Sequence, residues 1–379
     1  MWARWLCSLL APDGKYLASG GSDGTKIWDL ALRSEVNAPA SSWALRGATT
    51  QLLWLKRDDD TTEALVIGTQ AGYLVCWSDD VGKNKDASVF KQVWCRQLAT
   101  AAEITGLAFD AMTNKLAVCN RSGVIQLYTL RGTAIRDEVF SWPIHNCVPR
   151  SLEFGAMVNN ERELLVFGTF CGLVYPIRGN LPPSATMAWS LGCQIGDVAL
   201  DIENNVLCVN DPWTGVDTFN FREKTTVKSF AVPMTKSARV RNVSLGEKGA
   251  IVVSGSDDGV AFVFNRRNGA LVTKLRVDAS DWVQTVAVRD LRTEKIKALT
   301  GLETGDIKGI PHIFAAKSRE IAGRNAIFVY CKKTTRRRFL ARVAASFKMV
   351  VHVVVCLAAL LALYQNFSVY AFKVPVPRV

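Results

Sequence analysis

Residues 11–30 read APDGKYLASGGSDGTKIWDL. An apolar run that begins at Tyr16 is followed by a turn containing Gly24 and by a second run that ends in Trp28 and Asp29. Glycine adopts the positive φ that tight hairpin turns require without a steric penalty. The segment therefore predicts a β-hairpin whose turn is built around Gly24.

Copies of this hairpin pattern recur along the chain. Their turn glycines are Gly24, Gly72, Gly123, Gly172, Gly215, Gly259 and, in a degraded copy at 297–310, Gly305. Neighbouring members of the series lie about 43 to 51 positions apart, which is the period expected of four-stranded propeller blades. An apolar run precedes each hairpin, and an aromatic residue marks the outer strand expected after most of them: Trp43, Trp94, Trp142, Trp189 and Phe230.

We therefore predict an all-β fold, a seven-bladed β-propeller of four-stranded blades over residues 1–331 with an irregular last blade. One four-stranded sheet cannot bury both of its faces, whereas sheets stacked radially bury them against their neighbours. Because the chain begins at an inner strand, the sequence leaves open whether strand exchange closes the ring: either the seventh blade is short, or the chain lacks a native N-terminal extension. We predict an exposed sheet edge on the last blade.

The repeats resemble the WD-repeat family of β-propellers over residues 3–331. Trp28-Asp29 matches the signature dipeptide of the family, and Trp77 stands at the equivalent point of the next copy, followed by Ser78. The Gly-His dipeptide of the family is missing, so its buried Asp-His-Ser-Trp network is not expected and packing should hold the blades. The residues assigned to the structural repeat signature are Gly24, Trp28, Asp29, Gly72, Trp77, Gly123, Gly172, Gly215 and Gly259.

The basic charge of the chain is concentrated near its C-terminus. The net charge is +12, but residues 317–379 alone hold 12 Lys or Arg against one acid, Glu320. A nucleic-acid-binding domain would carry its charge across a folded face, so no nucleic-acid partner is expected. The chain has only 3 His, which argues against a multi-His metal site and against His-based catalysis. We predict no catalytic, cofactor-binding or metal-binding residue, no small-molecule substrate and no enzymatic activity.

The C-terminal segment is typical of a membrane anchor. A basic juxtamembrane stretch at 332–342 is followed by the apolar run 343–364, which is long enough to cross a bilayer as a helix, and by a short tail at 365–379. The membrane-proximal basic cluster comprises Lys332, Lys333, Arg336, Arg337, Arg338 and Arg342. By the positive-inside rule, the propeller would face the cytosol and the tail the lumen of an endomembrane, such as the endoplasmic reticulum. The alternative for the apolar run 343–364 is a buried or interfacial helix. The alternative for the basic stretch is a nuclear-localisation signal.

Three smaller features of the sequence bear on chemistry. His145 with Cys147 could form a nucleophile pair, although a surface loop before a strand is the simpler interpretation. Lys236, Arg239 and Arg241 could form a basic patch for an acidic partner or a membrane surface, or a solvated loop. The 10 cysteines include no CxxC pair, and several lie in apolar runs, which favours free thiols in a reducing compartment.

Two functions fit these patterns. The first is a non-enzymatic, membrane-tethered scaffold that binds protein partners on the loop faces of the propeller. The second is a membrane-anchored regulator of a small GTPase in vesicle trafficking, because the layout is similar to that of the guanine-nucleotide exchange factors of the endoplasmic reticulum. A hydrolase-type propeller would need acids or His on its inner strands, which are mostly apolar.

Overall fold

The computed structural model describes residues 5–11, 14–39, 43–55, 64–79, 90–158, 161–179, 187–233, 239–277, 282–289, 312–317 and 327–331. The chain divides into two compact units, Met1–Tyr330 and Cys331–Val379. All the structure described below, except the last residue of the final strand, belongs to the first unit.

The described residues form seven antiparallel sheets, each built from strands that are consecutive in the chain. The strands of the first four sheets are β1 (Trp5–Leu10), β2 (Tyr16–Gly21), β3 (Gly24–Asp29) and β4 (Ser34–Glu35); β5 (Thr49–Leu55), β6 (Ala64–Thr69), β7 (Tyr73–Asp79) and β8 (Phe90–Gln97); β9 (Ile104–Asp110), β10 (Lys115–Asn120), β11 (Val124–Arg131) and β12 (Ala134–Pro143); and β13 (Pro149–Val158), β14 (Glu161–Gly168), β15 (Leu173–Ile177) and β16 (Trp189–Ser190). Those of the last three are β17 (Asp197–Asp201), β18 (Val206–Asp211), β19 (Gly215–Asn220) and β20 (Thr225–Ala231); β21 (Val243–Gly246), β22 (Ile251–Ser254), β23 (Val260–Asn265) and β24 (Leu271–Arg276); and β25 (Val283–Arg289), β26 (His312–Lys317) and β27 (Ile327–Cys331).

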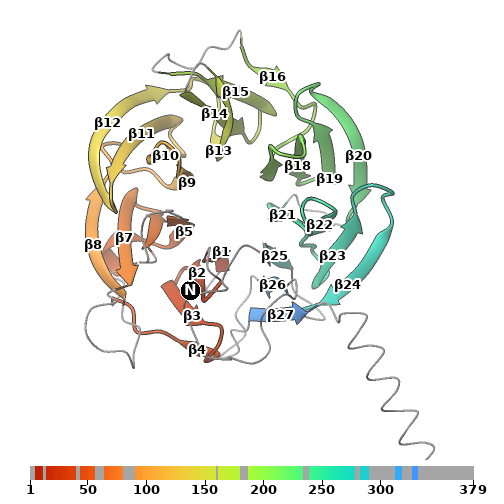
Figure 1. The fold of residues 1–379 in the computed structure, drawn as a ribbon, viewed down its shortest axis with the longest axis horizontal. Helices are drawn as coiled ribbons and strands as arrows, with labels where there is room; N and C mark the ends of the chain where they lie inside the picture. The colour runs from red at the N-terminus through yellow and green to blue at the C-terminus, as the bar shows by residue number, and fades with distance from the viewer. Residues whose placement is uncertain are drawn as a thin grey trace, which may run out of the picture. The chain divides into compact units, whose positions relative to one another are not determined.

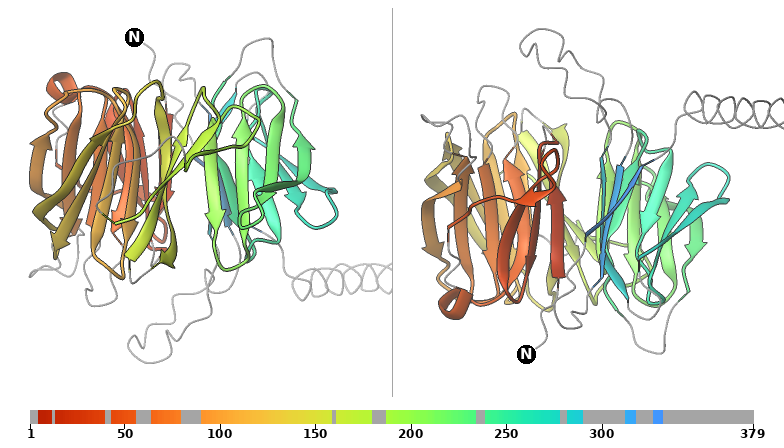
Figure 2. Two further views of the ribbon diagram at one scale, coloured as in Figure 1. Left: turned by 90° about the horizontal axis from the view of Figure 1, so that it is seen from above. Right: turned by 90° about the horizontal axis from the view of Figure 1, so that it is seen from below.

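The sheets are the blades of a ring, numbered here from 1 to 7 in chain order (Figure 1). The first strand of each blade lies toward the centre of the ring, and the later strands lie progressively outward. Figure 2 shows that the strands run between the two faces of the ring, so turns and connections are presented on those faces. The predicted seven-bladed propeller is confirmed.

The hydrophobic core consists of seven separate clusters, and each cluster fills the space between two neighbouring blades. Tyr16 of blade 1 meets Trp54 of blade 2 in one of them, with ring centroids 6.4 Å apart. The remaining clusters join blades 2 and 3, 3 and 4, 4 and 5, 5 and 6, 6 and 7, and 7 and 1. Each sheet therefore buries its faces against its neighbours, as the sequence argument requires.

The ring closes by packing of side chains. Leu17 of blade 1 packs against Ala287 and Phe314 of blade 7, and all three are buried. Among the described strands, no sheet combines segments from the two ends of the chain. Within the described residues, burial of these apolar side chains holds blades 7 and 1 together.

One predicted detail of the blades is wrong, and another lies outside the described residues. Trp43 does not mark an outer strand, because it begins the short helix α1 (Trp43–Arg46), and the fourth strand of blade 1 is β4. In blade 7, the strand paired with β25 is β26, whereas the predicted hairpin at 297–310, with Gly305, lies outside the described residues. Blade 7 has three strands in the described part of the chain, consistent with an irregular last blade.

The turn glycines of the repeat adopt the predicted conformation. Gly24, Gly72, Gly123, Gly172, Gly215 and Gly259 all have positive φ and lie between the second and third strands of their blades. At Gly172 (φ +62°), a Cβ atom would lie 2.3 Å from the carbonyl oxygen of Cys193, so the turn also requires the absence of a side chain. This close approach brings the β14–β15 turn of blade 4 against the connection that enters blade 5.

Candidate functional site

The turns between second and third strands share one face of the ring with the connections that enter the first strands. In blade 4, antiparallel pairing of Pro149 with Gly168 brings the start of β13 to the end of β14. In blade 5, pairing of Asp197 with Asn210 does the same for β17 and β18. We call the face that carries these segments the turn face.

Two large aromatic side chains are exposed on the turn face. Phe170 in the β14–β15 turn is 70% exposed, and Trp213 in the β18–β19 turn is 55% exposed. Each lies two positions before the turn glycine of its blade, Gly172 or Gly215, so they occupy equivalent positions in neighbouring blades. Exposed aromatic groups that lie together on a folded surface are typical of binding sites.

The β16–β17 connection is hydrogen-bonded to both turns. The backbone N–H of Ile195 donates to the carbonyl oxygen of Thr169, with a nitrogen–oxygen distance of 3.0 Å. One residue earlier in the chain, the Gln194 side-chain oxygen accepts a hydrogen bond from Trp213 Nε1 at 3.3 Å. We call Phe170, Gln194 and Trp213 the aromatic patch.

The Trp213 turn is supported from below by a buried arginine. Arg241 donates from Nη2 to the carbonyl oxygen of Pro212 at 3.0 Å and from Nη1 to Asp257 Oδ1 at 3.3 Å. The side chains of Arg241 and Asp257 are 0% and 1% exposed. Burial lowers the pKa of Arg241, while Asp257 opposes that shift. The Asp211 carboxylate accepts a further hydrogen bond from the Trp213 N–H at 2.8 Å.

Both interpretations of this stretch, a solvated loop and a basic patch, are therefore wrong for Arg241, which is a buried strut and not a surface cation. The guanidinium of Arg239 lies over the ring of Trp282, with 4.8 Å between its Cζ atom and the ring centroid. Lys236 lies outside the described residues. The sequence alone did not reveal the burial of Arg241, because its partners Pro212 and Asp257 are supplied by other segments of blades 5 and 6.

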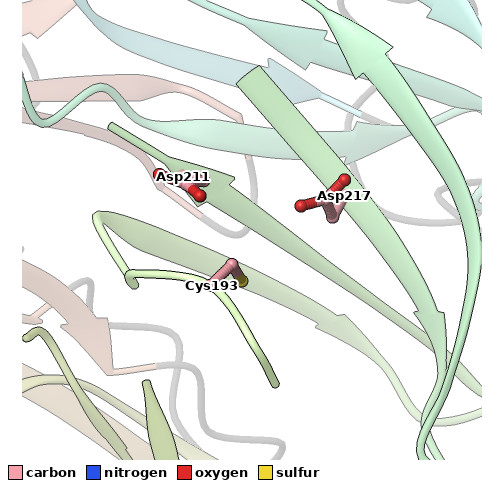
Figure 3. Close-up of side chains that lie close together, drawn as sticks. All are labelled: Cys193, Asp211 and Asp217. Carbon is pink, nitrogen blue, oxygen red and sulfur yellow. The ribbon is translucent and has the colours of Figure 1, made fainter. Parts of the chain in front are cut away.

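A small cluster of potential metal ligands lies next to the aromatic patch. The cluster consists of Cys193 in the β16–β17 connection, Asp211 at the end of β18 and Asp217 on β19. The potential ligand atoms of the three residues lie within 4.8 Å of one another (Figure 3). Burial and, to a lesser extent, Asp217 and Asp211 raise the pKa of Cys193 to about 12, so the thiol holds its proton at neutral pH. A metal ion would have to displace that proton, and three donors fall short of the four that a closed zinc site uses.

The inner strands also carry acids, and two of these acids, Glu153 and Asp197, have a raised pKa. Burial and Asp197 raise the pKa of Glu153 on β13 to about 8. Burial also raises the pKa of Asp197 on β17, although its hydrogen bonds oppose the shift. Asp197 accepts hydrogen bonds from Asn242 Nδ2 at 2.9 Å and from the Val243 N–H at 3.0 Å. Its position joins blade 5 to blade 6, which is a structural role.

The structure separates the residues of the suggested nucleophile pair. His145 is exposed and Cys147 is buried, both in the β12–β13 connection, so the surface-loop interpretation holds for His145. The Sγ atom of Cys147 lies 3.0 Å from Sγ of Cys171. Sequence reasoning missed this thiol pair, and also Phe170 with Trp213, although aromatic residues at the same offset from two turn glycines were a visible signal.

The segments predicted to anchor the protein lie beyond the described residues. These are the basic cluster from Lys332 to Arg342, the apolar run 343–364 and the tail 365–379. Within the part of the chain that the structure describes, no helix combines the length and apolar character needed to cross a bilayer.

Comparison with known proteins agrees with the fold. The sequence model of the family described as "WD domain, G-beta repeat" matches residues 4–29. This range covers the first three strands of blade 1, including Gly24, Trp28 and Asp29. No curated protein matches the chain. The local match and the seven-bladed ring together support a WD-repeat propeller, a fold that typically serves as a non-enzymatic scaffold for protein partners.

Proposed function

We propose that this protein is a membrane-tethered, non-enzymatic scaffold that docks a protein partner on its aromatic patch. The observation that carries the proposal is the exposure of Phe170 and Trp213 at equivalent turns of neighbouring blades. Aromatic residues dominate the binding energy of protein interfaces because they bury a large area with few rotatable bonds. A protein surface with apolar and hydrogen-bonding groups is the partner chemistry that fits this patch.

The patch is held in place before any partner binds. Glycine turns, the hydrogen bond between Gln194 and Trp213, and the buried Arg241 beneath Pro212 restrain its two aromatic segments. Preorganisation of this kind reduces the conformational entropy that binding would otherwise cost. A ring with interblade packing thus supplies a rigid support for docking.

The tether rests on the sequence beyond the described residues. The basic stretch 332–342 precedes the apolar run 343–364, and only Lys373 and Arg378 follow it. This charge asymmetry favours a cytosolic propeller, and the basic stretch favours an anionic leaflet. We propose a single-pass, C-terminal anchor in an endomembrane, with the endoplasmic reticulum as the first membrane to test.

Proximity labelling in intact cells tests the docking site. The full chain carrying a labelling enzyme at its N-terminus is compared with the double variant Phe170→Ser/Trp213→Ser. The matched control is Val227→Ser/Val272→Ser, which removes two exposed apolar side chains from the outer strands β20 and β24. We expect the aromatic-patch variant to lose a discrete set of neighbours that the control retains. Identical labelling by both variants, with unchanged thermal unfolding, would reject the patch as the docking site.

Membrane extraction tests the tether separately. The full chain and a chain that ends at Tyr330 are expressed in the same cells, and their membranes are washed with alkaline carbonate. We expect the full chain to stay in the pellet and the shorter chain to be released. Release of both chains would reject a spanning anchor while leaving the docking proposal intact.

A further inference from the structure

Two cysteine thiols meet at the turn-face end of blade 4. Cys147 lies in the connection that enters β13, and Cys171 lies in the β14–β15 turn, 24 positions later. Their Sγ atoms are 3.0 Å apart. The antiparallel pairing of Pro149 with Gly168 brings these two segments to the same end of the sheet.

The space that holds the two thiols exists because residue 168 is a glycine. A Cβ atom at Gly168 would lie 2.2 Å from Sγ of Cys147 and 2.4 Å from Sγ of Cys171. Any side chain there would displace both sulfur atoms. The backbone of blade 4 therefore positions the two thiols toward each other.

We propose that Cys147 and Cys171 are a modification site at which a reversible disulfide forms by exchange with a small-molecule disulfide. A disulfide has a sulfur–sulfur distance of about 2.05 Å, so the two atoms need to approach by about 1 Å, a movement available to side-chain rotation. The segments are adjacent in the folded blade, and the bond closes without rearrangement of the strands.

Accessibility sets the order of the two exchange steps. Cys171 is half-buried, whereas Cys147 is 8% exposed. The Cys171 thiolate attacks the small disulfide, forms a mixed disulfide and releases one small thiol. The Cys147 thiolate then attacks Sγ of Cys171 and expels the second small thiol. The two cysteine sulfurs lose two electrons, the small disulfide gains them, and the two protein protons end on the released thiols.

The thiol environment makes the exchange pH-dependent. Burial raises the pKa of the Cys147 thiol, and Cys171 raises it further, while a hydrogen bond to Tyr175 opposes the shift and Cys119 adds a small increase. Because the thiolate is the nucleophile, the second step should accelerate as the pH rises. The second step, attack by Cys147 on the mixed disulfide, is therefore slower at neutral pH than at higher pH.

The cross-link would also act on the aromatic patch, and this consequence rests on the proposed function. Cys171 directly follows Phe170, so a bond to Cys147 ties the turn that presents the ring to the connection that enters β13. Disulfide formation itself requires no partner protein. Its failure is therefore distinguishable from failure of the docking proposal.

Peptide mapping of the full chain in detergent tests the site. The protein is reduced, incubated with oxidised glutathione, quenched with an alkylating reagent and digested with trypsin. Cleavage after Arg136, Arg150, Arg162 and Arg178 places the two thiols in separate peptides, 137–150 and 163–178. We expect these peptides to become cross-linked, two hydrogens lighter than their sum, and to separate again with dithiothreitol.

Three variants make the outcome specific. Cys147→Ser should retain glutathione on Cys171, and Cys171→Ser should show neither the cross-link nor modification of Cys147. Cys95→Ser, which removes an exposed thiol on β8, should still form the cross-link. The proposal is overturned if the wild-type chain takes up glutathione at Cys95 while peptides 137–150 and 163–178 remain fully alkylated and are not cross-linked.

Discussion

The indole Nε1 of Trp28 donates a 2.8 Å hydrogen bond to the hydroxyl oxygen of Ser19 on the neighbouring strand. In blade 2, the register pairs Trp77 with Leu65 as it pairs Trp28 with Leu17, so Ile67 takes the place of Ser19. Accordingly, Trp77 Nε1 is buried without a hydrogen-bond partner among the described residues. The match to the WD-repeat family falls on the blade in which this Trp–Ser pair is intact.

The substitution Ser19→Ala should destabilise the protein by about 1–2 kcal/mol, because it leaves the Trp28 N–H without its acceptor. Urea unfolding of the wild type, Ser19→Ala, Trp28→Phe and the double variant measures the loss. Because the two residues share one hydrogen bond, we expect the double variant to lose about 1 kcal/mol less free energy of unfolding than the sum of the two single variants. Strict additivity would show that the pair contributes nothing to blade 1.

The close packing around Gly168 leads to a second prediction. Gly168→Ala should lower the free energy of unfolding by about 1–3 kcal/mol, because its Cβ would overlap both thiols. The loss should shrink when Cys147 and Cys171 are both replaced by Ala. Gly155→Ala in the neighbouring strand β13 is the control, since its nearest contacts are 3.3 Å or longer. A similar loss in both glycine variants would point to a backbone effect instead of a clash with sulfur.

Local turn chemistry is the part of the fold that the sequence predicts well. Gly172 is required by its φ and by close packing, and the described turn glycines mark blades 1 to 6 directly. The prediction fails at Trp43, which begins a helix although it resembles an outer-strand aromatic residue.

The candidate sites were harder to foresee because they depend on strand register. Cys147 meets Cys171, and Arg241 reaches Pro212, only after distant segments have paired. The sequence around an arginine in a polar segment looks the same whether its side chain is buried or exposed. The sequence pattern alone therefore cannot distinguish a buried arginine from a surface cation. Phe170 and Trp213 are the exception, since their common offset from a turn glycine is visible in the sequence.

The buried pair of Arg241 and Asp257 gives a third prediction. Asp257→Asn should cost about 3–5 kcal/mol, because it leaves a buried guanidinium without its counter-ion. Replacing both residues, with Arg241→Met and Asp257→Leu, should recover part of the loss in a urea titration. A loss below about 1 kcal/mol in Asp257→Asn would mean that water reaches the guanidinium and that the turn of Trp213 does not depend on this pair.

The raised pKa of Glu153, about 8, predicts how stability depends on pH. Between the ordinary pKa of a glutamic acid, about 4.5, and about 8, the folded chain keeps a proton that the unfolded chain releases, so stability falls as the pH rises through this window. Glu153→Gln removes that proton-linked loss. Because Glu153 is partly exposed, we expect the variant to exceed the wild type by about 1–3 kcal/mol at pH 8.5 and by little at pH 5.

Unfolding in urea at pH 5, 6, 7, 8 and 8.5 measures this difference for the two proteins side by side. Asp197, whose pKa is also raised by burial, is present in both chains, and its own contribution largely cancels in the comparison. Glu203→Gln, on the β17–β18 turn, serves as the matched control at each pH. If Glu153→Gln instead gains stability relative to the wild type as the pH falls, the carboxyl group is ionised in the folded ring, and the assignment of a buried proton to the inner face of β13 is wrong.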